Sequence, residues 1–283
     1  MDVVTGEIYD QLELTTKTIG SLLQLGNYEN TMIAGDYNGQ IYLIKVVNES
    51  IVELQLNSSH IHNDRIKGLI ELEDHSIISV SYDNQIKNFS ISNQNVFLLH
   101  HQTITDNWAT CVTKLSELLF IGSYDRKVKT YNTNSNNLEF ETEEFPHGIT
   151  GIYSNNDVVF VGLLDGSIYS LSKKGDYYEN RTLIAEGRAD IVCDIKSYEN
   201  NLSITSFNSM TTSWEIREDK LFFEKQFDTQ GSRVSEHLNE GKIIITGSIF
   251  GNIEIWDKKL YPIRQIKSKV HQNQGSVSLS DRL

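Results

Sequence analysis

The sequence lacks the features of a secreted or membrane-inserted protein. It contains two cysteines among 283 residues, too few for a framework of disulfides. The N-terminal segment MDVVTGEIYDQLEL has no basic stretch followed by an apolar run, and no stretch of the chain approaches 18 consecutive apolar residues. We therefore expect a cytoplasmic or nuclear protein that does not bind a membrane.

Basic residues are also scarce relative to acidic ones. The chain has 25 lysines and arginines against 38 aspartates and glutamates, which gives a formal net charge of −13. A chain of this charge is not expected to bind nucleic acid directly, because the phosphate backbone would be repelled. The net charge instead fits a soluble protein whose partner is a protein or peptide, with a basic partner favoured.

The sequence motifs of common enzyme and metal sites are absent as well. There is no His-x-x-x-His pair, no Cys-x-x-Cys pair, no phosphate-binding glycine loop and no Gly-x-Ser-x-Gly motif. His100 and His101 are adjacent in a predicted strand, which sends their rings to opposite faces. Cys111 and Cys193 are expected to be buried as small apolar residues. We expect neither a metal nor a cofactor.

What the sequence does contain is an internal repeat. SYDNQIKNF at Ser81–Phe89 returns as SYDRKVKTY at Ser123–Tyr131. Four further segments align with these two: GDYNGQIYLI, GLLDGSIYSL, TSFNSMTTSW and GSIFGNIEIW. The last residues of the six segments are spaced about 42 residues apart, a period typical of repeat folds; they are Ile44, Phe89, Tyr131, Leu171, Trp214 and Trp256.

Each repeat has the pattern of four β-strands. A nearly all-apolar run such as VVFVG precedes a polar turn, and a run that alternates polar with apolar residues follows, which together predict a hairpin. One further β-rich run lies before this hairpin and one after it. Four strands in about 42 residues is the size of one propeller blade.

The repeats resemble the WD-repeat β-propeller family over about residues 2–280. Trp256-Asp257 is the one literal Trp-Asp pair, and HNDRIKGL at His62–Leu69 resembles the opening of that family's first strand. The family has a buried hydrogen-bond relay of His, Ser or Thr, Asp and Trp in each repeat. By resemblance the relay residues are His62, Ser79, Asp83, Asp125 and Asp165. Phe89 replaces the Trp of the second repeat, and Asn38, Asn208 and Phe250 replace the turn acid elsewhere, so we expect blades held mainly by apolar packing.

The resemblance implies an all-β fold, a WD-repeat-type β-propeller in one domain over 1–283. We expect six complete four-stranded blades plus a partial seventh, closing blade. The blades are predicted at 18–60, 61–104, 105–145, 146–188, 189–230 and 231–268, with 2–17 as the last strand of the closing blade and 269–283 as its start. The alternative is that both ends are tails on a six-bladed ring.

The residue before each turn acid, or before its substitute, forms a column that should surround one mouth of the propeller channel. The column is Tyr37, Tyr82, Tyr124, Leu164, Phe207 and Ile249. These large residues either bind a partner or pack between neighbouring turns. Trp108 should lie on the same rim as an exposed anchor. Four basic residues should also lie near it, and they either read an acidic or phosphorylated peptide or are solvated turn residues: Arg65, Arg126, Lys127 and Arg233.

These features favour a non-enzymatic scaffold that binds a partner at the aromatic rim. We expect a monomer within a larger multiprotein complex; a substrate adaptor of a ubiquitin ligase would be a special case. The alternative is a propeller-fold hydrolase with acidic residues in the central channel. Buried carboxylates without ion pairs around the channel would favour the enzyme.

Overall fold

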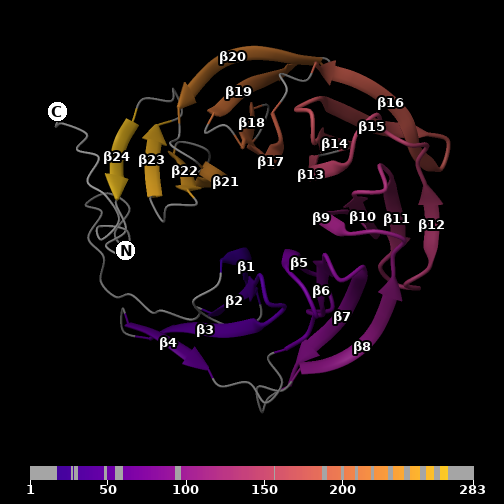
Figure 1. Cartoon of the computed structure of the whole chain (residues 1–283), viewed down its shortest axis with the longest axis vertical. Helices are drawn as coiled ribbons and strands as arrows, with labels where there is room; N and C mark the ends of the chain where they lie inside the picture. Colours follow the sequence, from indigo (N-terminus) through magenta and orange to yellow (C-terminus); the bar gives the residue numbers. More distant parts are fainter. Residues whose placement is uncertain are drawn as a thin grey trace. The chain divides into compact units, whose positions relative to one another are not determined.

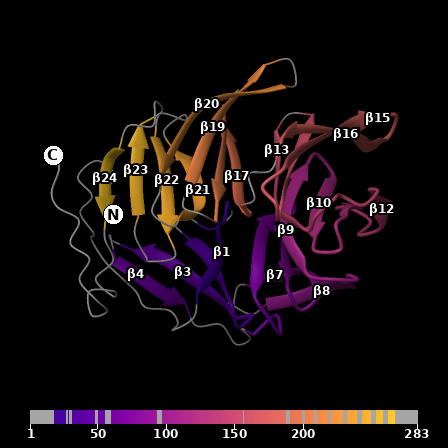
Figure 2. The same ribbon diagram turned by 45° about the horizontal axis from the view of Figure 1, so that its top comes forward.

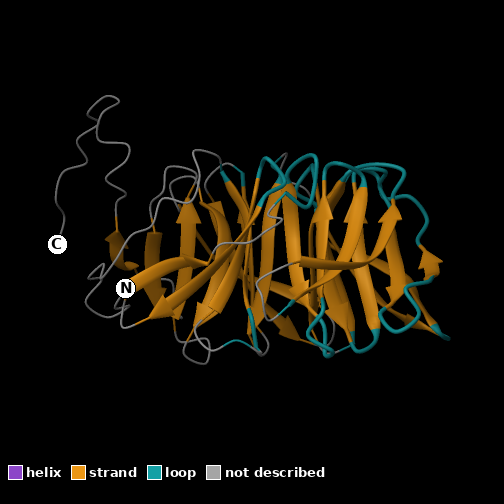
Figure 3. Ribbon diagram, turned by 90° about the horizontal axis from the view of Figure 1, so that it is seen from below, coloured by secondary structure: helices purple, strands orange, loops and turns teal. Residues whose placement is uncertain are grey.

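The computed structural model describes most of the chain between residues 18 and 266. The described residues are 18–26, 28, 31–47, 50–54, 60–92, 97–155, 157–186, 190–198, 201–207, 210–217, 220–228, 232–238, 243–248, 253–257 and 262–266. Their regular elements are all β-strands (Figure 3). The chain divides into two compact units, 1–189 and 190–283; the predicted single domain over 1–283 stays a prediction.

The first unit holds four sheets, each made of four antiparallel strands in sequence order (Figure 1). The first two sheets are β1 (Ile19–Gln24), β2 (Thr31–Asp36), β3 (Ile41–Val47) and β4 (Ser50–Leu54), then β5 (Ile66–Glu71), β6 (Ile77–Ser81), β7 (Gln85–Ile91) and β8 (Phe97–Ile104). The next two are β9 (Ala109–Leu115), β10 (Leu118–Ser123), β11 (Val128–Asn132) and β12 (Leu138–Glu141), then β13 (Ile149–Asn155), β14 (Val158–Leu163), β15 (Ile168–Lys174) and β16 (Tyr177–Ala185).

The second unit holds two sheets of the same topology. They are β17 (Val192–Tyr198), β18 (Asn201–Ser206), β19 (Met210–Arg217) and β20 (Lys220–Asp228), then β21 (Ser232–Leu238), β22 (Ile243–Ser248), β23 (Ile253–Asp257) and β24 (Pro262–Ile266). Each of the six sheets begins and ends inside one of the six segments predicted as complete blades.

The sheets are arranged as propeller blades. Within the first unit the first strand of each sheet lies beside the first strand of the next, so β1 contacts β5, β5 contacts β9 and β9 contacts β13 (Figure 1, Figure 2). In the second unit β17 contacts β21 in the same way. This arrangement of strands and sheets confirms the predicted all-β propeller fold. The strands predicted for a partial seventh blade, within 2–17 and 269–283, lie outside the described residues.

The hydrophobic core lies between adjacent sheets, as the strand patterns require. The second strands are buried on both faces: every residue of β6 is buried, and so is every residue of β10 and β14 after the first. One cluster joins Phe120 and Val128 of the third sheet to Ile149, Val161 and Tyr178 of the fourth. Because both faces of each second strand need a cover, the sheets stack face to face.

The turns between second and third strands share one backbone conformation. In each of the four sheets of the first unit, one residue in this turn has a positive φ: Gly39 (81°), Asn84 (65°), Arg126 (71°) and Gly166 (87°). The left-handed conformation is open to glycine and tolerated by asparagine, which accounts for three of the four residue choices. At Gly39 the backbone also approaches closely, since an added Cβ would lie 1.9 Å from the His62 carbonyl oxygen.

Two glycine substitutions separate the effect of this close approach from that of φ. Gly39 and Gly175 both have positive φ, 81° and 65°, but a Cβ at Gly175 would meet nothing within 4 Å. Gly175→Ala should lower the free energy of unfolding by roughly 1–2 kcal/mol through the left-handed conformation alone. Gly39→Ala should lower it by about 3 kcal/mol or more, because the backbone must also move. Urea unfolding of both variants measures this, and equal losses would contradict the packing of the Gly39 turn against His62.

Candidate partner-binding surface

One backbone hydrogen bond positions the predicted column of large residues. The N–H group of each column residue that the structure describes donates to a carbonyl just before the first strand of the same sheet. The pairs are Tyr37 to Thr18 (3.0 Å), Tyr82 to Arg65 (3.1 Å), Tyr124 to Trp108 (3.1 Å), Leu164 to Gly148 (2.9 Å) and Phe207 to Ile191 (2.9 Å). The column residue therefore lies beside the chain that enters its own sheet, at the same end of every sheet in which it is described.

In the first unit these side chains form a continuous row, which we call the aromatic row: Tyr37, Arg65, Tyr82, Trp108 and Tyr124. The Arg65 guanidinium lies 4.9 Å from the centre of the Tyr37 ring and 5.7 Å from that of Tyr82. Tyr82 and Trp108 stack with centroids 4.8 Å apart and an interplanar angle of 7°. Trp108 and Tyr124 meet edge to face at 5.2 Å. Such contacts stabilise each neighbour by cation–π and aromatic interactions.

The row joins three successive sheets because Arg65 and Trp108 hold equivalent positions. Each comes one residue before the first strand of its sheet and inserts between the column residues of that sheet and the preceding one. Sequence reasoning identified Trp108 and the tyrosines separately but did not find that Arg65 and Trp108 alternate with them. The signal was available, since both residues stand at the same place in consecutive repeats.

Members of the row differ in how much surface they present. Tyr37, Tyr82 and Tyr124 are partly buried, and burial raises the pKa of Tyr82 to about 12, with Tyr124 and Tyr37 adding to the effect. Trp108 keeps 41% of its surface exposed. The tyrosines thus make the contacts expected of residues that pack between turns, while Trp108 has accessible apolar area.

The remaining residues predicted for this surface are distributed over both units. Leu164, in the first unit, is partly buried. Phe207, in the second unit, is 53% exposed. Ile249 and the side chain of Arg233 lie outside what the structure describes.

The basic residues of the third sheet's turn are paired with carboxylates. Arg126 forms an ion pair with Glu144, and Lys127 with Glu141. The buried Nζ of Lys129 lies 2.9 Å from Asp106 and 3.1 Å from Asp125. The positive charges of Arg126 and Lys127 in the predicted basic cluster are therefore largely neutralised. Glu141 lies in the last strand of the same sheet, and Glu144 lies in the segment that follows it.

The relay residues of the second sheet are hydrogen bonded to one another. His62 Nδ1 lies 3.0 and 2.9 Å from the two Asp83 carboxylate oxygens, and Nε2 lies 2.7 Å from Ser79 Oγ. Burial lowers the pKa of His62, although Asp83 opposes the shift. Burial alone would raise the pKa of Asp83, but hydrogen bonds from His62 and the Asn63 N–H lower it. This fits a neutral His62 that donates to Asp83 and accepts from Ser79, with Phe89 fully buried nearby in the sheet.

The other sheets of the first unit use different groups at the equivalent positions. His62, Thr105 and Phe145 each donate a backbone N–H to the preceding sheet's turn, so they are structurally equivalent. Asp125 and Asp165 keep the turn acid and accept the N–H groups of Lys127 (3.1 Å) and Ser167 (3.0 Å). Threonine and phenylalanine cannot reproduce the histidine's two hydrogen bonds, and the turn acids have other partners: Lys129 Nζ lies 3.1 Å from Asp125, and His147 Nε2 lies 3.5 Å from Asp165.

In the first sheet the turn acid is Asp36, which sequence reasoning missed. Its buried carboxylate accepts the N–H groups of Asn38 (2.8 Å) and Gln40 (2.9 Å) and the Tyr42 hydroxyl (3.1 Å). Sequence reasoning treated Asn38 as a replacement of the turn acid, because Asn38 aligns with Asp83 and Asp125 of the next repeats. The acid is instead supplied two residues earlier, within the same GDYNG turn.

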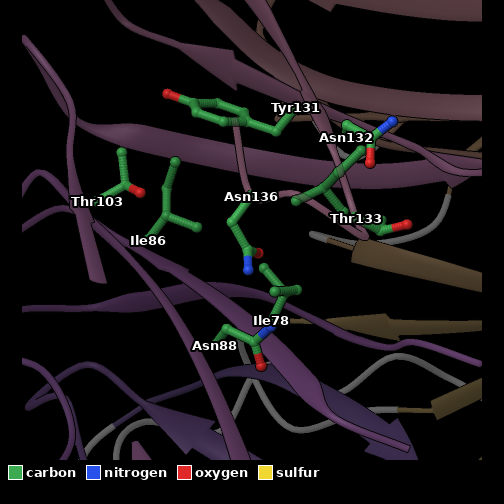
Figure 4. A pocket seen from close by; sticks show the side chains of 9 residues that line it. Ile78, Ile86, Asn88, Thr103, Tyr131, Asn132, Thr133 and Asn136 are labelled. Atoms are coloured by element: carbon green, nitrogen blue, oxygen red, sulfur yellow. The ribbon is translucent and has the colours of Figure 1, made fainter. Parts of the chain in front are cut away.

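Two cavities in the first unit lie away from the aromatic row. One of about 20 Å³, room for a single water molecule, lies between the second and third sheets and is lined by Asn88, Tyr131 and Asn136 among others (Figure 4). The other, of about 200 Å³, lies beside Phe140, Tyr177 and Tyr178. Within the described residues no group of His, Cys, Asp or Glu could hold a metal ion, and the described part contains no helix able to cross a membrane.

Comparison with models of known protein families found no match, and comparison with curated proteins found none either.

The relay makes stability depend on pH in a defined direction. The pKa values of His62 and Asp83 are both lower in the folded protein than their ordinary values of 6.5 and 3.8. The unfolded chain therefore takes up protons first, and the free energy of unfolding should fall as pH decreases from about 6.5.

The variant His62→Gln should lower the free energy of unfolding by about 1–3 kcal/mol at pH 7.5, because it disrupts bonds to buried groups. It should also flatten the pH dependence between pH 7 and 5. Urea unfolding across that range measures both effects, and equal slopes for the variant and the original chain would exclude a contribution from His62.

Proposed function

We propose that this protein is a non-enzymatic platform that binds a protein or peptide partner across the aromatic row, as part of a multiprotein complex. The observation that carries the proposal is Trp108, which keeps 41% of its surface exposed while its ring is stacked on Tyr82. Tryptophan, tyrosine and arginine are the residue types enriched at the centres of protein interfaces, and the row contains all three.

Preorganisation supports the same proposal. Tyr82 holds the Trp108 ring from one side, and the Trp108 carbonyl accepts the Tyr124 N–H at 3.1 Å. A partner that covers Trp108 would therefore immobilise little that is not already fixed, which lowers the entropic cost of binding. An exposed aromatic residue with no such support would lose more rotamer freedom on association.

The hydrolase alternative is weakened by where the candidate groups lie. Ser79, His62 and Asp83 have the order of hydrogen bonds seen in a serine hydrolase triad. However, Ser79 has no exposed surface, so a substrate carbonyl could not reach its hydroxyl. The buried Asp36 carboxylate is occupied by three donors of its own turn. These contacts favour a structural role for both groups and support the platform.

We also propose that the propeller is of the WD-repeat type. The repeat period, the turn acids and the His62–Ser79–Asp83 bonds support it. A monomer in the cytoplasm or nucleus, bound to protein rather than to nucleic acid or membrane, is consistent with the acidic net charge.

Alanine substitutions along the row should separate binding from packing. Once a partner has been identified by affinity capture, Trp108→Ala should weaken its binding about thirtyfold, or about 2 kcal/mol, while the lost ring contacts lower the melting temperature only modestly. Tyr82→Ala should lower both affinity and melting temperature, because Tyr82 supports Trp108 and is itself partly buried. Leu183→Ala is the matched control, since Leu183 is 45% exposed on β16 and lies outside the row.

Binding and melting are measured in parallel for all three variants. Unchanged affinity of Trp108→Ala and Tyr82→Ala would contradict the proposed surface. A loss confined to Tyr177→Ala, beside the larger cavity, would instead place the partner between the third and fourth sheets.

A further inference from the structure

Two positive charges converge on one ring at the start of the aromatic row. The Arg65 guanidinium lies 4.9 Å and the Lys67 ammonium 5.5 Å from the centre of the Tyr37 ring. Neither side chain has an ion pair among the residues that the structure describes. The ring attracts both cations, but it does not neutralise them, so the pair remains a local excess of positive charge.

The basic residues of the third sheet are arranged differently. Acidic residues outnumber basic ones by 38 to 25, and the cations of the neighbouring turn, Arg126, Lys127 and Lys129, are all paired with carboxylates. Asp64 is adjacent to Arg65 in sequence, but its carboxylate accepts the Arg65 backbone N–H at 2.7 Å. The charged groups of Arg65 and Lys67 thus lie close together with no carboxylate paired to them among the described residues, and two such cations can bind an anion.

The anion site and the exposed tryptophan are both neighbours of the Tyr82 ring. Tyr82 separates the two, because its ring lies 5.7 Å from the Arg65 guanidinium and 4.8 Å from the Trp108 ring. A peptide in the polyproline II conformation has three residues per turn and rises about 3.1 Å per residue, so side chains three residues apart lie on one face, separated by roughly 9 Å. A peptide lying along the row could therefore place one group on Arg65 and another on Trp108.

We infer that the partner presents a segment in the polyproline II conformation in which an aspartate or glutamate binds Arg65 and Lys67 and an apolar side chain three residues away covers Trp108. This inference rests on the proposed function and specifies the partner's chemistry. The proposed ligand is acidic, whereas the net charge of the whole chain alone favours a basic partner. A phosphate could supply the negative charge to the same two cations, and the test below distinguishes it from a carboxylate.

The test uses the full chain and a set of fluorescein-labelled peptides made mainly of glycine and serine. One peptide carries Glu and Phe three residues apart, a second has Gln in place of Glu, and a third has Glu and Phe adjacent. Fluorescence anisotropy should show that the first binds about tenfold more tightly than either of the others. A fourth peptide, with phosphoserine in place of Glu, tests whether the site binds a phosphate rather than a carboxylate.

Charge-removing variants then localise the effect. Arg65→Gln and Lys67→Gln should each reduce the advantage of Glu over Gln severalfold. Lys45→Gln, which removes an exposed lysine of β3 outside the row, should leave that advantage unchanged. Melting temperatures of all three variants check that they remain folded.

The outcomes distinguish this inference from the platform proposal. Binding that depends on Trp108 but is equal for Glu and Gln peptides overturns the acidic ligand and leaves the platform intact. Binding of the phosphoserine peptide alone overturns the carboxylate assignment. No binding of any peptide, or equal losses in Arg65→Gln and Lys45→Gln, overturns the inference; partner binding that survives Trp108→Ala and Tyr82→Ala overturns the platform proposal as well.

Discussion

The arrangement of the candidate surface depends on one backbone hydrogen bond, from the turn between the second and third strands to the carbonyl that precedes the first strand. It recurs in five sheets, at 2.9–3.1 Å. The bond ties each turn to the chain entering its own sheet, and thus brings the side chains at both positions to one end of the sheet. Because neighbouring sheets stack face to face, side chains from successive sheets then meet. The aromatic row follows from this geometry once the residues involved are Tyr, Arg and Trp.

The fold was accessible from the sequence because its determinants are local and repeated. An apolar run, a polar turn and an alternating run appear in each repeat, and each predicted repeat contains one four-stranded sheet. The relay contacts of His62 were accessible for the same reason, since the motif lies within one repeat. Asp36 was missed because alignment assumes a fixed turn length, whereas a carboxylate two residues earlier reaches the same N–H groups.

Contacts between repeats were less accessible. Stacking of Arg65 and Trp108 between tyrosines depends on how adjacent sheets pack, which composition does not encode. The pairing of Arg126 with Glu144 lies within one repeat, but it joins a turn residue to a residue 18 positions further on, after the last strand of the sheet. For that reason the four basic residues expected near one end of the propeller proved unequal. Arg126 and Lys127 are paired, whereas Arg65 has no ion pair among the described residues, and the side chain of Arg233 lies outside them. Local pairing, rather than the net charge, determines which cations remain available to a ligand.

The central claim is that the row acts as one packed unit that supports an exposed tryptophan. A double-mutant cycle on the free energy of unfolding tests it most directly, with Tyr82→Leu, Trp108→Leu and the double variant measured by urea denaturation. Rings stacked at 4.8 Å should give a coupling energy of about 0.5–1.5 kcal/mol. Strictly additive losses would show that Tyr82 and Trp108 stabilise the protein independently, and would contradict the account.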